Sequence, residues 1–223
     1  MNGFLTALQQ ADSAFPSGSF AFSNGIEGLA ALGAALGRDG FAAVVATTIR
    51  HRWASADRVA VVHAHRAGDN LAAVAAIDAA VEGASFAEPL LSGSKRNGGA
   101  LLAAHVRLGT RLALDLRSWI EAGRALGHLP VVQGFIWAKL GVSEKDAVAI
   151  SGYTTAAGLI AAAVRLGEVG AIEAQTVLAS VIMVVAETAE REIPKDLEIA
   201  SFTPWLDIAA ARQARAQVRL FAN

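Results

Sequence analysis

Cysteine does not occur anywhere in this chain of 223 residues. Without cysteine the chain can form no disulfide, present no thiol nucleophile and offer no thiolate to a metal ion. Disulfides belong to oxidising compartments, so a chain that uses none is compatible with the reducing cytoplasm. The N-terminus also lacks the basic start and apolar run of a signal peptide, since Asp12 and Pro16 interrupt it early. We therefore expect a cytoplasmic protein.

Charge is also scarce: charged residues make up 17% of the chain and the formal net charge is −1. No global field draws such a chain to nucleic acid or to an anionic bilayer, so neither is an expected partner. Apolar residues account for 54% of the sequence, against about 45–50% in an average soluble domain. Because little polar surface remains to cover a monomer, the composition predicts a sizeable protein–protein interface.

Two uncharged runs could be taken for membrane spans. Residues 147–164 include polar and glycine positions such as Ser151, Gly152 and Thr154, whereas a spanning helix needs about 20 predominantly apolar residues. Residues 174–186 are more apolar but too short. Buried or interface helices are the favoured interpretation of both runs, and a membrane-associated helical protein is the weaker alternative.

Apolar residues recur at spacings of three and four along most of the sequence, and strict alternation is hard to find. This pattern predicts an all-α fold with one domain over residues 1–223, a bundle of about eight to ten helices. The predicted helices cover residues 4–10, 20–36, 39–68, 71–81, 100–126, 130–140, 143–166, 169–190 and 205–220. Ser143 with Asp146, and Thr203 with Pro204, are typical helix starts.

Two stretches stand out within this helical pattern. The predicted helix 169–190 is apolar on every side between Val177 and Ala186, so we expect protein to surround it, in the core or at a dimer seam. The glycines and the proline between Gly83 and Gly99 predict the loosest part of the chain and a candidate mobile loop.

Residues 12–28 are unlike the rest of this alanine-rich chain, because they crowd one proline, three glycines, four serines and three phenylalanines. Pro16 fixes its own φ and favours extended geometry before it, while Gly18 permits a positive φ. Ser17 or Ser19 could then cap a helix that begins near Phe20. The segment is predicted to be a shaped turn. Its phenylalanines, Phe15, Phe20 and Phe22, either fix it to the core or face a partner.

This turn resembles the N-terminal signature of the UreF family of urease accessory proteins, from Leu8 to Leu29 with its Phe-Pro-Ser-Gly-Ser-Phe core at 15–20. Residues 163–175 resemble the late motif of the family, and Asp207-Ile208 with Arg219-Leu220-Phe221 resembles its C-terminal ending. The three matches occur in family order over nearly the whole chain. Two positions differ from the family pattern, namely Ala171 and Gln213, where glutamine and histidine are usual, which puts any polar role there in doubt.

The resemblance implies a non-catalytic, cytoplasmic, all-α homodimer without a cofactor. Such a protein joins UreD (also called UreH) and the GTPase UreG in the complex that inserts nickel into urease and so matures the enzyme. The matching residues become candidate partner contacts. They are Phe15, Pro16, Ser17, Gly18, Ser19, Phe20, Phe22, Asn24, Gly25, Glu27, Arg165, Gln175, Pro204, Trp205, Asp207, Arg212, Arg219, Leu220 and Phe221.

Catalytic motifs are hard to find. The chain has no Gly-x-Ser-x-Gly elbow, and none of its five histidines lies in a recognisable motif. A small helical hydrolase acting around Ser17 or Ser19 is the weaker alternative. The run Gly93-Ser-Lys-Arg-Asn-Gly-Gly99 places two cations among glycines but is not a phosphate-binding loop. No nucleotide hydrolysis is expected.

Candidate metal ligands are equally few. On a helix, His63 and His65 point in different directions, and only His65 with Asp69 has the i, i+4 spacing of a ligand pair. Two ligands do not make a tight site, so another segment or subunit would have to complete the coordination. We interpret His63 as a core histidine and His65 as a solvated one. A direct nickel metallochaperone that uses His63, His65 and Asp69 remains the alternative.

The predicted last helix carries Arg212, Arg215 and Arg219 on one stripe. Cations near a helix C-terminus complement its dipole, and the same stripe could dock an acidic partner. Trp205 and Phe221, at the two ends of this segment, could be aromatic anchors for a partner or could fold into the core.

Overall fold

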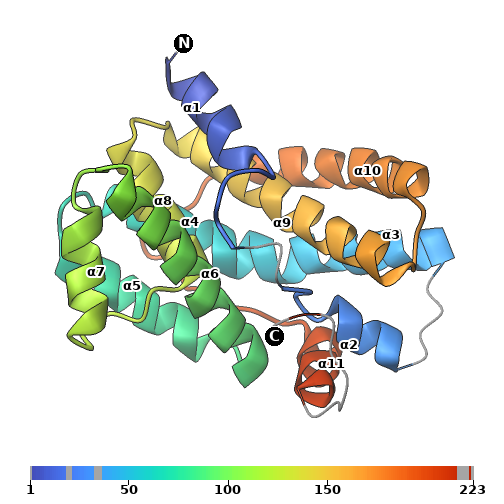
Figure 1. The fold of residues 1–223 in the computed structure, drawn as a ribbon. Coiled ribbons are helices and arrows are strands. Elements are labelled where there is room, and N and C mark those ends of the chain that lie inside the picture. The colour runs from blue at the N-terminus through green and yellow to red at the C-terminus, as the bar shows by residue number, and fades with distance from the viewer. Residues whose placement is uncertain (1, 19–21, 33–36, 215–220, 222–223) are drawn as a thin grey trace.

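The computed structural model describes residues 2–18, 22–32, 37–214 and 221, and every regular element among them is a helix. The elements are α1 (Asn2–Ala11), α2 (Ile26–Ala31), α3 (Gly37–Thr48), the π-helix η2 (Ile49–Asp57), α4 (Arg58–Arg66), α5 (Leu71–Gly83), α6 (Glu88–Arg107), α7 (Ala113–Glu121), α8 (Leu129–Lys139), α9 (Glu144–Leu166), α10 (Ala171–Ala189) and α11 (Pro204–Gln213). Because α3, η2 and α4 follow without a break, they form one long helix, and the described residues then hold ten helices (Figure 1). The predicted all-α fold is confirmed.

Several helices begin where the sequence predicted a start. The Ser143 hydroxyl accepts a hydrogen bond from the Asp146 amide at 3.1 Å, which caps α9. Pro130 and Pro204 lie in the first turns of α8 and α11, where a missing amide proton costs nothing. The Thr203 side chain, however, makes no capping hydrogen bond, so that part of the prediction is wrong.

Two large hydrophobic clusters and a small third one of Ala87, Leu90 and Ala210 form the interior of the described chain. One lies between α2, α3, η2, α9, α10 and α11 and centres on Phe41 and Trp53. The other lies between α4, α6, α7 and α8 and centres on Phe135 and Trp137. Helices α4 and α9 contribute residues to both clusters, so they join the two ends of the molecule.

The predicted mobile loop between Gly83 and Gly99 is wrong, because α6 begins at Glu88 and runs through most of it. Two of its glycines lie at close contacts. A Cβ atom added at Gly93 would lie 3.2 Å from the Phe22 ring, and one at Gly98 would lie 2.0 Å from the Gly127 carbonyl oxygen. These contacts offset the low helix propensity that made the segment look like a loop.

Two helix boundaries also differ from the prediction. The predicted helix 100–126 is divided, since α6 ends at Arg107 and a turn with positive φ at Gly109 and Leu112 precedes α7. The predicted helix 20–36 is represented only by α2, which begins after Gly25 (φ 90°). Residues 33–36 of that prediction lie outside the described part of the chain, as do residues 215–220 of the predicted last helix.

Of the two predicted places for α10, the core of one chain and a dimer seam, the structure contradicts the first, and the dimer seam stays a prediction. Val177 and Val181 face the core, but Ile172 and Met183 are 82% and 69% exposed on the opposite side. The residues 144–165 and 171–189 are long and apolar enough to cross a membrane by length and composition, and 56% of the first window but 33% of the second is buried. Helix α9 is therefore a core helix, whereas α10 has an uncovered apolar face.

Candidate functional site

The turn after α1 is shaped by local hydrogen bonds. The Asp12 carboxylate accepts from the Ala14 amide at 2.8 Å and the Asp12 carbonyl accepts from the Phe15 amide at 3.0 Å. Gly18 has a φ of 74°, the positive value that its sequence position predicted. Phe15 and Pro16 lie in this turn, on the segment that connects α1 to α2. Ser19 and Phe20 lie outside the described residues.

The Phe15 ring fixes this turn to α6. It stacks on the His105 ring, with centroids 5.4 Å apart. The His105 ring is fully buried and contacts Thr110 Oγ1 at 2.9 Å and Gln10 Oε1 at 3.1 Å, and Gln10 Oε1 also accepts from Trp137 Nε1 at 3.2 Å. Burial lowers the pKa of His105 to about 4, so this histidine is neutral at physiological pH.

Phe22 also belongs to the core, with 8% of its surface exposed, and it packs against Gly93 of α6. Asn24 and Gly25 follow with φ values of 51° and 90° and turn the chain into α2. The two described phenylalanines of the turn thus fix it to the bundle, which is one of the two roles that the sequence left open.

Helices α2 and α11 lie side by side although they come from opposite ends of the sequence (Figure 1). Small residues allow the contact: a Cβ atom at Gly28 would lie 2.2 Å from the Ala209 carbonyl oxygen, and one at Gly25 would lie 3.1 Å from the Leu206 side chain. The buried Gln213 amide donates to the Glu27 carboxylate across the same contact. The structure therefore brings the N-terminal and C-terminal motifs together.

The outer face of α11 is apolar and exposed. Phe202, just before the helix, and Trp205, in its first turn, have 76% and 74% of their surface exposed, and Ile208 follows one turn later. Pro204 and Arg212 are exposed on the same helix. We call Phe202, Trp205 and Ile208 the α11 surface. Exposed aromatic side chains next to an arginine are typical of a protein-binding surface.

Asp207 lies beside this surface and is half-buried. Burial raises the pKa of its carboxyl group, and the nearby charge of Arg52 opposes that rise.

The remaining predicted contacts lie on other helices. The Arg165 guanidinium of α9 lies 4.2 Å from the centroid of the buried Phe221 ring, so Phe221 folds into the core. Gln175 is exposed on α10. Arg219 and Leu220 lie outside the described residues, as does Arg215.

A cavity of about 440 Å³ lies beneath the N-terminal turn. It is lined by Asp12 and Ser17 of the turn, by Arg52 and Asp57 of η2, and by residues of α6, α8 and α9. Burial raises the pKa of Asp57, and the neighbouring charges of Arg52 and His128 oppose that rise. The side-chain oxygen of Asn97, which lines the same cavity, is buried and has no hydrogen-bond partner in the described structure.

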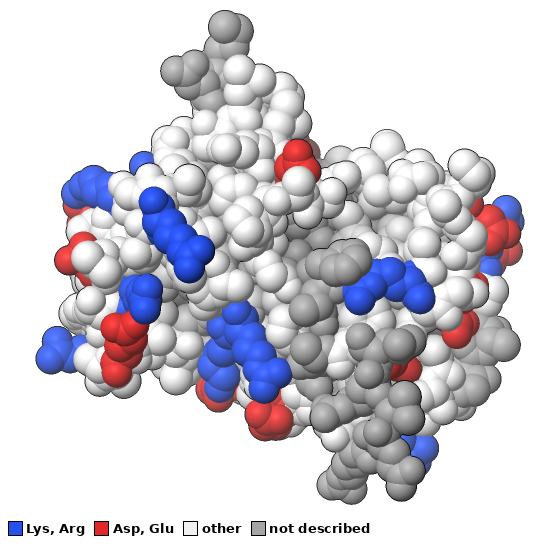
Figure 2. Space-filling view, in the orientation of Figure 1, with Lys and Arg blue, Asp and Glu red and all other residues white. Residues whose placement is uncertain are grey.

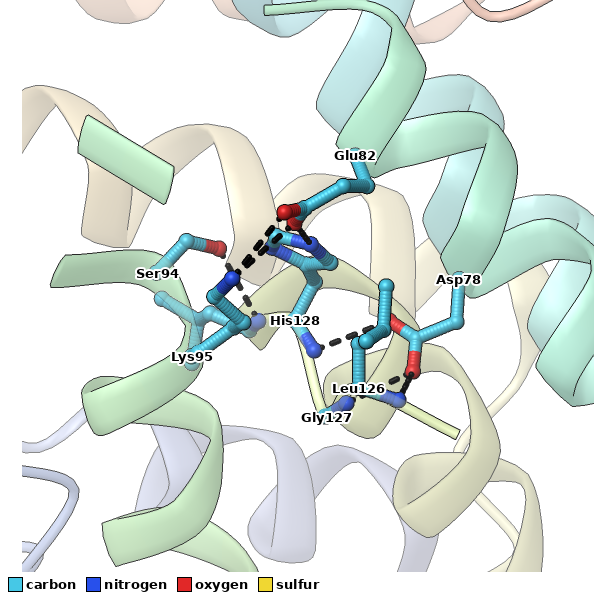
Figure 3. Close-up of polar contacts among 8 residues, drawn as sticks. Asp78, Glu82, Ser94, Lys95, Leu126, Gly127 and His128 are labelled. Carbon is cyan, nitrogen blue, oxygen red and sulfur yellow. Dashed lines mark hydrogen bonds and ion pairs between the residues drawn. The ribbon is translucent and has the colours of Figure 1, made fainter. Parts of the chain in front are cut away.

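A second group of polar side chains lies between α5, α6 and the start of α8, with Asp78 and His128 buried and Glu82, Ser94 and Lys95 half-buried (Figure 3). The Asp78 carboxylate accepts from three consecutive amides, those of Leu126 and Gly127 at 2.6 Å and that of His128 at 2.9 Å. His128 Nε2 donates to Glu82 at 2.6 Å, and Lys95 donates to the same carboxylate at 3.1 Å. Burial raises the pKa of Glu82, but these two donors outweigh it and hold the pKa below its usual value.

This group combines histidine, lysine, serine and carboxylate side chains, yet its geometry is structural. The neighbouring space measures about 20 Å³, room for one water molecule and not for a substrate. Ser94 Oγ is occupied as an acceptor from the Leu129 amide at 3.2 Å. The group joins α5, α6 and the start of α8. We call Asp78, Glu82, Ser94, Lys95 and His128 the Asp78 cluster.

Each of the candidate metal ligands contacts a different part of the structure. His63 Nε2 contacts the Leu197 carbonyl and His65 Nε2 contacts the Val142 carbonyl, each at 2.9 Å. Asp69 forms ion pairs with Arg111 and Lys139, whose hydrogen bonds hold its pKa well below the usual range. Within the described part of the chain, no three histidine or carboxylate side chains are placed to hold a metal ion.

Several of these features have no signal in the sequence. The π-helix occupies part of a stretch that has an ordinary helical pattern. Asp78 and the loop at 126–128 are 48 to 50 residues apart, and Gln10 and His105 are 95 apart. Only an i, i+4 pair of acids on one helix, Asp78 and Glu82, could have drawn attention to the Asp78 cluster.

Comparison with known proteins supplies the context for this geometry. A family model described as UreF matches residues 37–182. Urease accessory protein UreF 1 of Brucella melitensis is 33% identical over 227 residues, which cover 99% of this chain and 93% of that protein. Urease accessory protein UreF 2 of Brucella abortus is 32% identical, with 99% and 92% covered. Urease accessory protein UreF of Yersinia enterocolitica is 29% identical, with 98% and 97% covered.

Proposed function

The chain belongs to the UreF family of urease accessory proteins, and from that premise we propose that it is a non-catalytic scaffold in urease maturation. It joins UreD (UreH) and the GTPase UreG in the complex that inserts nickel into urease. Nickel is the cargo of this complex, and this chain holds no cofactor of its own. We place the protein in the cytoplasm, where its partners and urease act.

The observation that carries this proposal is the α11 surface beside the N-terminal turn. A surface with exposed Phe202, Trp205 and Ile208 presents apolar area to water, and such area is stabilised when a partner covers it. The neighbouring turn is fixed to the core by Phe15 and Phe22, so the surface is presented on a preformed support. Preformed surfaces lose little conformational entropy when they bind.

The outer face of α10 supports a homodimer. Ile172 and Met183 are exposed there, with Ile182 and Gln175 between them, and the exposed Glu187 and Glu190 follow at the C-terminal end of the helix. In Figure 2 the upper part of the molecule, where α1 and α10 lie, shows far fewer charged side chains than the left and lower edges. A second copy could cover this face while the α11 surface remains free for UreD.

The experiment is co-purification with UreD after co-expression. Substitution of Trp205→Ala together with Ile208→Ala removes exposed apolar area only, and we expect at least tenfold less UreD to co-purify. Deletion of residues 204–223 is less informative, because it would also remove Leu206, Ala209 and Phe221 from the core. Size-exclusion chromatography with light scattering then gives the number of copies in each complex.

The matched control is Leu108→Ala with Leu114→Ala, two leucines of the α6–α7 end that are each 63% exposed. This variant should bind UreD as the unmodified chain does, and circular dichroism should be the same for both. Wild-type recovery of UreD by the Trp205 and Ile208 variant would show that α11 does not carry this contact.

A further inference from the structure

The long helix Gly37–Arg66 contains an unusual segment, the nine-residue π-helix η2. Runs of π-helix are rare and are found mainly as single turns at functional sites. The hydrogen-bond geometry of an α-helix is the default for such a sequence, so a π-helix persists only where other contacts favour it. The contacts of η2 therefore indicate what holds it in this form.

Arg58 lies where η2 returns to the α-helical form. Its amide donates to the Trp53 carbonyl, five residues back, and the carbonyl of Ala54 instead accepts from the Arg58 side chain, Nε, at 3.2 Å. The same guanidinium donates through Nη1 to the carbonyls of Thr188 at 2.8 Å and Arg191 at 2.7 Å. One buried side chain thus ends the π-helix and binds the C-terminal end of α10.

The segment after α10, residues 190–203, crosses the long helix, and we call it the strap. Its Ala200 amide donates to the Ser55 carbonyl and its Phe202 amide donates to the His51 carbonyl, each at 3.0 Å. Both acceptors belong to η2 and lie four residues apart. Two backbone donors of the strap are therefore bound to the outer carbonyls of the π-helix.

Farther along the helix the strap is held by side chains. His63 Nε2 contacts the Leu197 carbonyl at 2.9 Å, and Arg66 Nη1 donates to the Ile193 carbonyl at 2.7 Å. The strap then continues directly into the α11 surface. Whatever moves the strap must change the bonds of η2 as well.

The same π-helix reaches the cavity beneath the N-terminal turn. Arg52 and Asp57 line that cavity, and their charged atoms lie 3.8 Å apart. The Arg52 charge also acts on Asp207 of α11. Segment η2 therefore lies between the α11 surface on one side and the cavity on the other.

We propose that η2 is a conformational joint, held in the π form by the strap, which couples the position of the C-terminal unit to the cavity. Here the C-terminal unit is the strap with α11. When the strap leaves, the Ser55 and His51 carbonyls lose their external donors and the segment changes toward the α-helical form. The change in helical register rotates Arg52 and Asp57 relative to the cavity. This inference concerns the chain itself and does not depend on which partner binds α11.

Hydrogen exchange measured by mass spectrometry on the full chain tests the joint. The variant Ala200→Pro removes the amide that donates to Ser55. Each η2 amide must break its bond to the i−5 carbonyl before it can bond to the i−4 carbonyl, so loss of the strap contact raises the population of open states. We therefore expect peptides covering residues 49–58, and the amide of Phe202, to exchange at least tenfold faster than in the unmodified chain. Peptides from α5 to α8 should keep their protection. The matched control is Glu198→Pro, an exposed strap position for which no backbone hydrogen bond is formed by the amide in the described structure.

Equal protection of residues 49–58 in the two variants would overturn the proposal, even if the strap itself loosens. Hydrogen exchange of the unmodified chain provides a second test if a proline variant does not fold. The amides of residues 53–58 and those of Ala200 and Phe202 should open together, with the same rate and the same dependence on urea. Opening of the strap amides at least tenfold more often than those of η2 would show that the two are not coupled.

Discussion

The two ends of the molecule are held together in different ways. At one end, α5, α6 and the start of α8 meet around the Asp78 cluster, where a buried carboxylate satisfies three amides and Glu82 binds both His128 and Lys95. At the other end, the described residues of α2 and α11 meet through glycine contacts and through the hydrogen bond from Gln213 to Glu27. The first end is fixed by buried polar groups, the second mainly by close packing.

Exposed apolar side chains occur at both ends, Phe86, Leu108 and Leu114 around α5–α7 and Phe202 and Trp205 at α11, so the ends differ in how their helices are joined. The end with α11 presents Phe202 and Trp205 to solvent, whereas in the Asp78 cluster Asp78 and His128 are buried and the side chains of Glu82 and Lys95 are 36% and 34% exposed. The Asp78 carboxylate favours one arrangement, since an alternative leaves its amide donors unsatisfied, although the buried Nδ1 of His128 has no hydrogen-bond partner among the described residues. Contacts between small residues allow adjustment at lower cost. The comparison predicts a rigid frame at one end and an adjustable docking region at the other.

The largest expected effect comes from the rigid end. The substitution Asp78→Ala would leave three amides without an acceptor, and the two buried ones, of Gly127 and His128, each cost about 1–3 kcal/mol. We expect the free energy of unfolding to fall by about 3–5 kcal/mol. Urea denaturation followed by circular dichroism measures it.

Asp115→Ala is the control for that change, because Asp115 is an exposed acid in the first turn of α7. Its loss should cost less than about 1 kcal/mol. A cost for Asp78→Ala no greater than that of the control would remove the distinction between the two ends.

The next effect concerns the link between the N-terminal turn and α6. Burial lowers the pKa of His105 to about 4, from an ordinary value of 6.5. Below pH 6.5 the unfolded chain therefore binds a proton that the folded chain does not, and stability falls as the pH falls from 6.5 to 4. The difference amounts to about 3 kcal/mol across this range.

The variant His105→Gln should show a smaller loss of stability between pH 7 and pH 4, measured by urea denaturation at each pH. His51→Gln, which changes an exposed histidine, should keep the slope of the unmodified chain. Equal slopes for His105→Gln and the unmodified chain would mean that this histidine binds a proton equally in the folded and unfolded states.

The sequence predicts those features of the two ends that depend on neighbouring residues, and it misses those that depend on contacts between residues far apart in the chain. Helix starts at Pro130, Ser143 and Pro204 are local features, and the structure confirms them. The sequence predicts a loop through Gly93 and Gly98, where the structure has a helix. The contacts that favour this helix come from Phe22 and Gly127, which are distant in the sequence. Helix propensity says nothing about such tertiary contacts.

The candidate site shows the same limit. The N-terminal and C-terminal motifs were identified separately, but nothing in the sequence indicated that Gly28 touches Ala209. The sequence allows Phe15 a role in the core or at a partner surface, and only the stacking on His105 distinguishes the two. The sequence does not indicate the π-helix, because its hydrogen bonds to Ala200 and Phe202 link residues about 150 apart in the chain. Partner contacts at the exposed residues remain predictions.

The smallest of these effects belongs to the adjustable end. In Gly28→Ala the new methyl group would lie 2.2 Å from the Ala209 carbonyl oxygen, so α2 and α11 must move apart. Overpacking of this kind costs about 1–3 kcal/mol. Because the contact lies beneath the α11 surface, recovery of UreD should fall as well, although most of the fold survives.

Gly99→Ala is the matched control, a glycine inside α6 with no atom within 4 Å of the added Cβ. It should raise stability by about 0.5–1 kcal/mol, because alanine favours the helix and meets no neighbour. The comparison between the two ends therefore rests on two measurements for each variant, the free energy of unfolding and the recovery of UreD. If Gly28→Ala destabilises the chain as much as Asp78→Ala, the α2–α11 contact is part of the rigid frame. If it leaves UreD recovery unchanged, the docking region tolerates the displacement of α11.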